Sequence, residues 1–415
     1  HRDLHSFPTR RSSDLVLLGV GIMVTTNLIH GWQIGIYSAI GSPSEIYSDV
    51  WKVNSIFSFI SSYEALQPNL SIHAQTQPPG AILWIYILSL ISNDPAHIAL
   101  MLAIGASSLS SLFLYGFLKR MFDKRYAEYV VMLYLLLPAI QVYYLANIYA
   151  IVSTLILGVL YFYFHSQTKT RVIGTSIFMF LAIFTSFLSI FIPLCLGLYE
   201  LLVLFKNGYL KKAKFQTLGG SGWIREVWQQ VQIYIFACIA VIAILGLIWM
   251  GLGFNYLNAF LYASELENPG GFMLLTNPTN YFVTRLQNVL DIAIFYGPIL
   301  GYLSYRGYKI LKSENDLFVP TTQIGQESKQ EQKPMDKSIY YLPLAALLAL
   351  GLMFLVGAPK KGETARICMF ILPFLLVYLM AYLKSKDFEQ KQLIWLLIVV
   401  LLQTLILQSM ATYIW

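Results

Sequence analysis

Long apolar segments alternate with short polar segments along most of this 415-residue chain. Several apolar segments reach the roughly 18–20 residues that an α-helix needs to cross a bilayer. They are continuous and do not alternate residue by residue, which favours helices over the strands of a membrane barrel. The pattern predicts an all-α, polytopic integral membrane protein with about eleven transmembrane helices, near residues 16–36, 98–118, 128–145, 148–165, 172–187, 188–205, 232–254, 286–305, 339–357, 366–383 and 393–412.

The positive residues between these predicted spans gather on one side. An alternating path through the membrane places twenty Lys and Arg residues on that side and five on the other. Because positively charged loops favour the cytoplasm, the large first loop, 41–97, is predicted to be extracytoplasmic. The segment 309–337 is rich in Gln, Glu, Ser and Lys, and we expect it to be a disordered cytoplasmic linker.

Composition supports a membrane protein and excludes several other classes. The chain is 57% hydrophobic and 12% charged, unlike a soluble domain. Its net charge of +7 lies in loops between predicted spans, which indicates membrane topology and no nucleic-acid partner. Cys195, Cys238 and Cys368 share no metal-ligand spacing. Residues 1–15 resemble a translated sequencing adapter, so we expect them not to be native and place a single domain at 16–415.

The first loop holds the candidate chemistry. Tyr47-Ser48-Asp49 is followed by apolar residues at helical spacing between positions 53 and 63, which predicts an interfacial helix. The loop then reads His73-Ala74-Gln75-Thr76-Gln77-Pro78-Pro79-Gly80. The next apolar segment, 81–92, is too short to span and predicts a second interfacial or re-entrant helix. Asp94-Pro95 predicts an N-cap and a proline in the first turn of the following span.

This order of features resembles the GT-C fold of membrane glycosyltransferases, in the branch of protein O-mannosyltransferases and aminoarabinose transferases. The resemblance is best in the module 16–205, with its catalytic loop 41–97, and weaker in the more variable helices of 206–415. It implies inverting transfer of a hexosyl or pentosyl group from a polyprenyl-phosphate donor to a lipid, glycan or protein acceptor. The reaction belongs to cell-envelope glycosylation on the extracytoplasmic face, and we expect a bacterial plasma membrane.

The resemblance also implies roles for individual residues. Asp49 corresponds to the loop acid that acts as general base. The segment Gly362-Glu363-Thr364-Ala365-Arg366 resembles a late motif of related bacterial proteins, and positive charge there would hold the donor phosphate. The substrate-binding candidates are Tyr47, His73, Gln75, Gln77, Pro78, Pro79, Lys360, Lys361, Glu363 and Arg366.

Some positions depart from the family's pattern. Asn147 and Tyr149 stand where that pattern has further acids, and Gln77 stands where a charged residue is common. Asp49 also fits a solvated loop acid or a helix cap, and Arg366 also fits a simple partner of Glu363. Asp291 lies inside a predicted span and is a functional candidate for that reason. No cofactor is indicated with certainty, and the role of a divalent cation stays open.

Other functions stay open at this point. A transporter or flippase of lipid-linked or small polar substrates would also be polytopic, but no internal repeat is visible. A glycan ligase or polymerase would share the extracytoplasmic site and transfer a whole glycan. A non-catalytic membrane subunit would tolerate loss of the Asp49 carboxylate.

Overall fold

The computed structural model describes residues 9–145, 147–209, 212–316, 337–359 and 364–412, and every regular element in these ranges is a helix. The N-terminal part comprises α1 (Thr9–Asn27), η1 (Leu28–His30), η2 (Gln33–Tyr37), α2 (Ser38–Gly41), η3 (Ile46–Lys52), α3 (Ile56–Leu66), η4 (Gln67–Asn69), α4 (Ile72–Gln75) and α5 (Gly80–Ser89). The central part comprises α6 (Pro95–Leu118), α7 (Lys124–Leu136), α8 (Pro138–Tyr143), α9 (Ile148–Tyr163), α10 (Thr168–Thr185), η5 (Phe187–Ile190), α11 (Phe191–Lys206) and α12 (Lys212–Leu252). The C-terminal part comprises α13 (Tyr256–Glu267), α14 (Met273–Thr276), α15 (Pro278–Tyr296), α16 (Pro298–Asp316), η6 (Lys337–Tyr340), α17 (Tyr341–Leu355), α18 (Thr364–Ile367), η7 (Met369–Ile371), α19 (Leu372–Ser385) and α20 (Gln390–Met410).

The helices confirm a polytopic membrane protein. Within the described ranges, five helices are long and apolar enough to cross a membrane, and the bent pair formed by α15 and α16 makes six if it counts as one span. Several other apolar helices are shorter than 18 residues. The predicted number of eleven spans is therefore not shown. The five full-length candidates are Pro95–Leu118, Phe187–Lys206, Gly220–Leu252, Ser338–Leu355 and Gln390–Met410.

Several predicted spans are interrupted in the structure, among them 16–36, where α1 ends at Asn27, and 366–383, which is divided into α18, η7 and α19. The prediction of one continuous helix over 286–305 is wrong, because the chain turns by 96° between α15 and α16. Gly297 occupies this turn with a φ of 106°, a conformation that glycine adopts without a steric penalty. The predicted helix at 128–145 is divided into α7 and α8 at Pro138, whose ring restricts the preceding residue to an extended conformation.

Other sequence predictions of local structure are confirmed. The short apolar segment after the double proline forms α5, which has ten residues. Asp94 caps the next helix by accepting a hydrogen bond from the Ala96 amide at 2.8 Å, and Pro95 occupies the first turn. The predicted linker 309–337 begins as helix, since α16 continues to Asp316, and 317–336 lie outside the described residues.

The predicted interfacial helix exists as α3, but its apolar residues divide between two environments. Ile60 and Tyr63 are buried against the protein, together with Phe59. Phe57 is 71% exposed, and Ile56 is also exposed. The face of α3 that was expected to lie in the membrane interface therefore contributes partly to the protein core.

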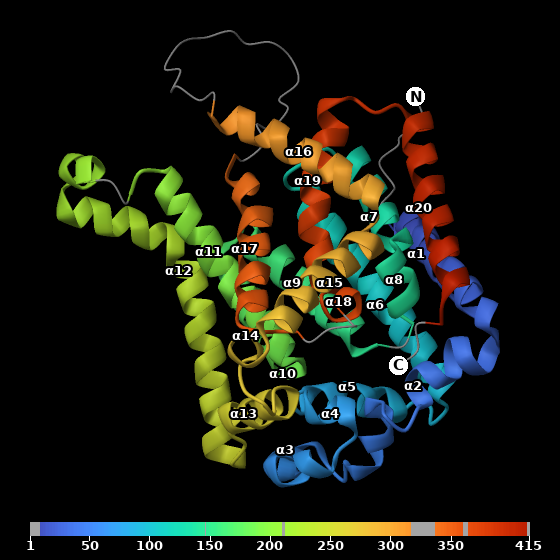
Figure 1. Ribbon diagram of the computed structural model, residues 1–415. Coiled ribbons are helices and arrows are strands. Elements are labelled where there is room, and N and C mark those ends of the chain that lie inside the picture. Colours follow the sequence, from blue (N-terminus) through green and yellow to red (C-terminus); the bar gives the residue numbers. More distant parts are fainter. Residues whose placement is uncertain (1–8, 146, 210–211, 317–336, 360–363, 413–415) are drawn as a thin grey trace.

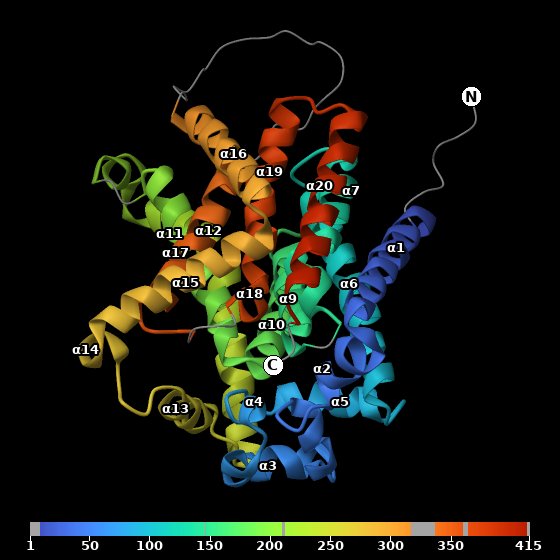
Figure 2. The same cartoon turned by 45° about the vertical axis from the view of Figure 1, so that its right-hand side comes forward.

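The bundle has two distinct ends. In Figures 1 and 2, α3, α4, α5 and α13 lie together at one end, and the connection between α19 and α20 lies at the opposite end. Lys386 lies in that connection, and Lys384 and Lys391 lie in the helix ends on either side of it. The loop with the candidate chemistry and this basic connection are therefore separated by the length of the bundle, as the charge pattern predicts.

Close helix packing gives the C-terminal half of the bundle a defined geometry. The helices α16 and α19 pack against each other along their lengths. A Cβ atom at Gly307 of α16 would lie 1.8 Å from the carbonyl oxygen of Tyr378 in α19, so only glycine fits there. Small residues of this kind allow membrane helices to approach closely.

Candidate functional site

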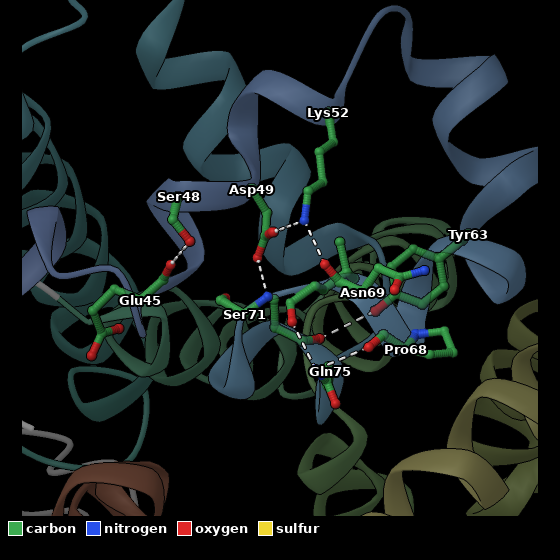
Figure 3. A network of polar contacts seen from close by, with 11 residues as sticks. Glu45, Ser48, Asp49, Lys52, Tyr63, Pro68, Asn69, Ser71 and Gln75 are labelled. Carbon is green, nitrogen blue, oxygen red and sulfur yellow. Dashed lines mark hydrogen bonds and ion pairs between the residues drawn. The ribbon is translucent and has the colours of Figure 1, made fainter.

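Asp49 joins two parts of the first loop. It lies in η3, and 1% of the residue is exposed. Its Oδ1 accepts a hydrogen bond from Lys52 Nζ at 2.8 Å, and its Oδ2 accepts one from the Ser71 amide at 2.8 Å (Figure 3). Lys52 Nζ also donates to the carbonyl oxygen of Asn69 at 2.6 Å. The carboxylate thus connects η3 to the chain that enters α4.

The contacts of Asp49 offset the cost of burying its negative charge. A buried carboxylate is costly unless it is paired and hydrogen-bonded, and here an ammonium group and an amide supply both needs. Each carboxylate oxygen has two lone pairs, so Asp49 retains acceptor capacity after these two contacts. A hydroxyl group that reached this site would find an acceptor already fixed in position.

Tyr63 of α3 holds the segment that contains the double proline. Its hydroxyl group donates to the carbonyl oxygens of Gln77 and, at 3.3 Å, of Ala74. Burial raises the pKa of the Tyr63 phenol, and the negative charge of Asp49 raises it further. Tyr63 is therefore a neutral hydrogen-bond donor, and its role was not expected from the sequence.

The Gln77-Pro78-Pro79-Gly80 segment is buried between helices. The Gln77 side-chain amide donates to the Tyr149 hydroxyl group at 2.9 Å, in the first turn of α9. A Cβ atom at Gly80 would lie 2.2 Å from the backbone carbonyl oxygen of Phe184, so this position requires glycine. The double proline is thus fixed against the ends of α9 and α10.

His73 lies beside an acid that the sequence did not single out. His73 Nε2 is 3.7 Å from Glu45 Oε1, and both side chains are partly accessible to solvent. The backbone carbonyl oxygen of Glu45 accepts a hydrogen bond from Ser48 Oγ at 2.8 Å, which stabilises the turn before Asp49. Glu45 precedes Asp49 by four residues, and Figure 3 shows its bond with Ser48 beside the contacts of Asp49.

Tyr47 and Gln75 contact the main chain of the loop. The Tyr47 hydroxyl group donates to the carbonyl oxygen of Asn93 at 2.5 Å, immediately before α6. Gln75 Nε2 donates to the carbonyl oxygen of Leu70 at 2.7 Å. Both side chains therefore hold the loop in shape, and these contacts explain their presence without a substrate.

Arg366 lies in a different part of the fold. It is 7% exposed and belongs to α18, which packs against α8, α15 and η7, whereas η3 packs against α2, α4 and α5. The preceding residue, Ala365, donates its amide to Asp291 Oδ2 at 2.7 Å. Lys360, Lys361 and Glu363 lie outside the described residues. The other candidates lie in the first loop, where separate contacts hold them, namely Tyr47, Asp49, His73, Gln75, Gln77, Pro78 and Pro79.

The described residues around Asp49 do not fit a divalent cation. In the part of the chain that the structure describes, no three His, Cys, Asp or Glu side chains lie close enough together to hold a metal ion. The positive charge next to Asp49 is the ammonium group of Lys52. Because calcium or magnesium takes several oxygen ligands, we derive no step through a metal ion.

Comparison with known proteins shows a likeness of fold. No protein-family model matches the chain, and no curated protein matches it. The crystal structure of the Archaeoglobus fulgidus oligosaccharyltransferase in complex with zinc and sulfate is similar, with 13% sequence identity and a TM-score of 0.50. The likeness covers 96% of this chain and 53% of the archaeal one, so the chain spans about half the length of that protein. The chain therefore shares its fold with this archaeal oligosaccharyltransferase, and the narrower branch that the sequence resembles is not tested by this likeness.

Proposed function

We propose that this chain is a membrane glycosyltransferase that moves a sugar from a polyprenyl-phosphate donor to an acceptor on the extracytoplasmic face. The observation that carries this proposal is the fold shared with an oligosaccharyltransferase over 96% of the chain. The buried acid in the first loop, at the end of the bundle opposite a basic connection, supports the same function. The acceptor is a lipid, a glycan or a protein.

In the proposed reaction, an acceptor hydroxyl group attacks the anomeric carbon of the donor sugar. The bond from that carbon to the phosphate oxygen breaks, polyprenyl phosphate leaves, and the configuration inverts. Asp49 accepts the hydroxyl proton or orients the hydroxyl group, a contribution of about 10²- to 10⁴-fold for general-base catalysis. The contacts with Lys52 and Ser71 fix the carboxylate before the acceptor arrives.

The departing phosphate requires positive charge. Arg366 is the proposed phosphate ligand, since a guanidinium group offers paired donors to phosphate oxygens. Lys360 and Lys361, close to Arg366 in the sequence, would add charge, and Glu363 would orient Arg366. The first-loop candidates would form the walls of the site, held by the bonds from Tyr63 and Gln77.

A second candidate is transfer of a whole glycan in one step. The fold match favours it specifically, because the similar protein is named as an oligosaccharyltransferase. The two functions differ in the donor that they accept, namely a polyprenyl phosphate that carries one sugar or one that carries an oligosaccharide.

The test measures release of free polyprenyl phosphate or diphosphate by the purified protein from a panel of lipid-linked donors, with lipid, glycan and protein acceptors present. The panel includes single hexoses, single pentoses and oligosaccharides. Release from a single-sugar donor supports the proposed function, and release from oligosaccharide donors alone supports the second candidate. No release from any donor, together with donor movement across sealed liposomes, would establish a transporter or flippase instead.

A further inference from the structure

Four side chains of α15 form a stripe along one face of the helix. Tyr281, Arg285, Asn288 and Asp291 are spaced at i, i+4, i+7 and i+10, which places them on the same side. We name these four residues the α15 stripe. Each of them makes a hydrogen bond to the main chain at the end of α17, at residues 358–359 or in α18.

The first two side chains of the α15 stripe donate hydrogen bonds to main-chain carbonyl groups at the end of α17 and just beyond it. The Tyr281 hydroxyl group donates to the carbonyl oxygen of Leu355 at 2.7 Å. The Arg285 guanidinium group donates to the carbonyl oxygens of Ala358 at 3.2 Å and Pro359 at 2.7 Å. The last carbonyl groups of a helix have no partner within the helix, and a cation near them is also favourable for the helix dipole.

The second half of the α15 stripe reaches the segment that contains Arg366. Asn288 Nδ2 donates to the carbonyl oxygen of Pro359 at 3.2 Å. Asp291 Oδ2 accepts the amide of Ala365 at 2.7 Å, directly before Arg366. The stripe therefore binds the chain on both sides of residues 360–363, and it binds the main chain next to the proposed phosphate ligand.

The chain after Arg366 is also held. It continues through η7 into α19, which packs closely against α16 with Gly307 at the contact. Arg366 thus lies between a main-chain bond to α15 on one side and a packed helix pair on the other. Both supports act on the main chain next to Arg366.

We infer that the α15 stripe positions Arg366 for the donor phosphate, with Asp291 as the main positioning residue. This inference rests on the proposed function. The hydrogen bond that the Ala365 amide donates to the Asp291 carboxylate restricts the backbone next to Arg366, so it fixes the residue that would bind the donor phosphate. Asp291, a carboxylate within α15, is explained by this role without any contact to the substrate.

The experiment compares Asp291→Ala, Asp291→Asn and the control Gln287→Ala, which changes an exposed polar residue of the same helix. Asp291→Ala is expected to raise the KM for the donor about tenfold, with a change in kcat below about twofold, since a contact made equally in ground and transition states affects KM alone. Asp291→Asn retains an acceptor oxygen and is expected to recover the KM to within about threefold of the wild-type value. Asn288→Ala, which removes only the bond to Pro359, should give a smaller rise in the donor KM. It replaces Asp291→Ala in the test if that variant does not fold.

Hydrogen–deuterium exchange in peptide 364–371 provides a readout that is independent of activity. Faster exchange in Asp291→Ala, with unchanged exchange in Gln287→Ala, is expected. Unchanged exchange in Asp291→Ala would overturn the inference, and so would faster exchange with an unchanged donor KM. A wild-type protein that releases no polyprenyl phosphate would overturn the proposed function, and the exchange data would still report whether Asp291 holds this segment.

Discussion

Replacement of Lys52 by Met would leave the Asp49 carboxylate buried without its ammonium partner. Removal of one partner of a fully buried ion pair costs about 3–5 kcal/mol. The Asp49 side chain is 2% exposed, but that of Lys52 is 39% exposed, so water can replace part of the lost contact. We therefore expect the first loop to be destabilised by about 1–2 kcal/mol in Lys52→Met.

Hydrogen–deuterium exchange around Ser71 measures this loss directly, because the Ser71 amide donates to Asp49. A loss of about 1–2 kcal/mol corresponds to exchange that is about 5- to 30-fold faster in a peptide covering 69–75. The matched control is Asp49→Asn combined with Lys52→Met. The double variant removes both charges, so its exchange should be closer to wild type than that of Lys52→Met. Exchange within twofold of wild type in Lys52→Met would refute the assignment of this ion pair as a structural support.

Two further predictions concern the buried segment after α4. Gly80→Ala should lower the free energy of unfolding by about 1–3 kcal/mol, because its Cβ would lie 2.2 Å from the Phe184 carbonyl oxygen. The control is Gly105→Ala, which has open space at its Cβ and should not lower the melting temperature. Equal melting temperatures for the two variants would contradict this prediction. Gln77→Ala and Tyr149→Phe should each cost about 1 kcal/mol, since each removes the same 2.9 Å hydrogen bond. The double variant should lose no more free energy of unfolding than the more destabilised single variant. Fully additive losses would show that the two side chains act independently.

Local features of the fold could be predicted from the sequence where a short pattern determines them. Asp94 and Pro95 specify a helix start through a cap and a fixed φ, and the structure has both. The short apolar segment after the double proline could not span a membrane at any register, and it forms the ten-residue helix α5. Hydropathy over 286–305, in contrast, contains no signal for the 96° turn, although the Gly297-Pro298 pair at that point is a turn signal that the span prediction did not use.

The candidate site was predictable only in part. Lys52 lies three residues after Asp49, and that spacing could have indicated an ion pair, but spacing does not show that Ser71 completes the site from 22 residues away. The contact between Asp291 and the Ala365 amide spans 74 residues and depends on how α15 and α18 pack. Contacts between residues so far apart in the sequence have no local sequence pattern. The residues that support Asp49 and Arg366 are therefore recognised only in the structure.

The most direct test of the central claim compares wild type with Asp49→Asn in release of polyprenyl phosphate from the donor that the wild type uses. The change keeps the size of the side chain and an oxygen that can accept from Ser71, and it removes the charge. A loss of about 10²- to 10⁴-fold in kcat, measured at a temperature below the unfolding transition of both proteins, is the result that general-base catalysis by Asp49 predicts. Full turnover in Asp49→Asn would contradict the claim and leave Asp49 as a structural anchor of the first loop.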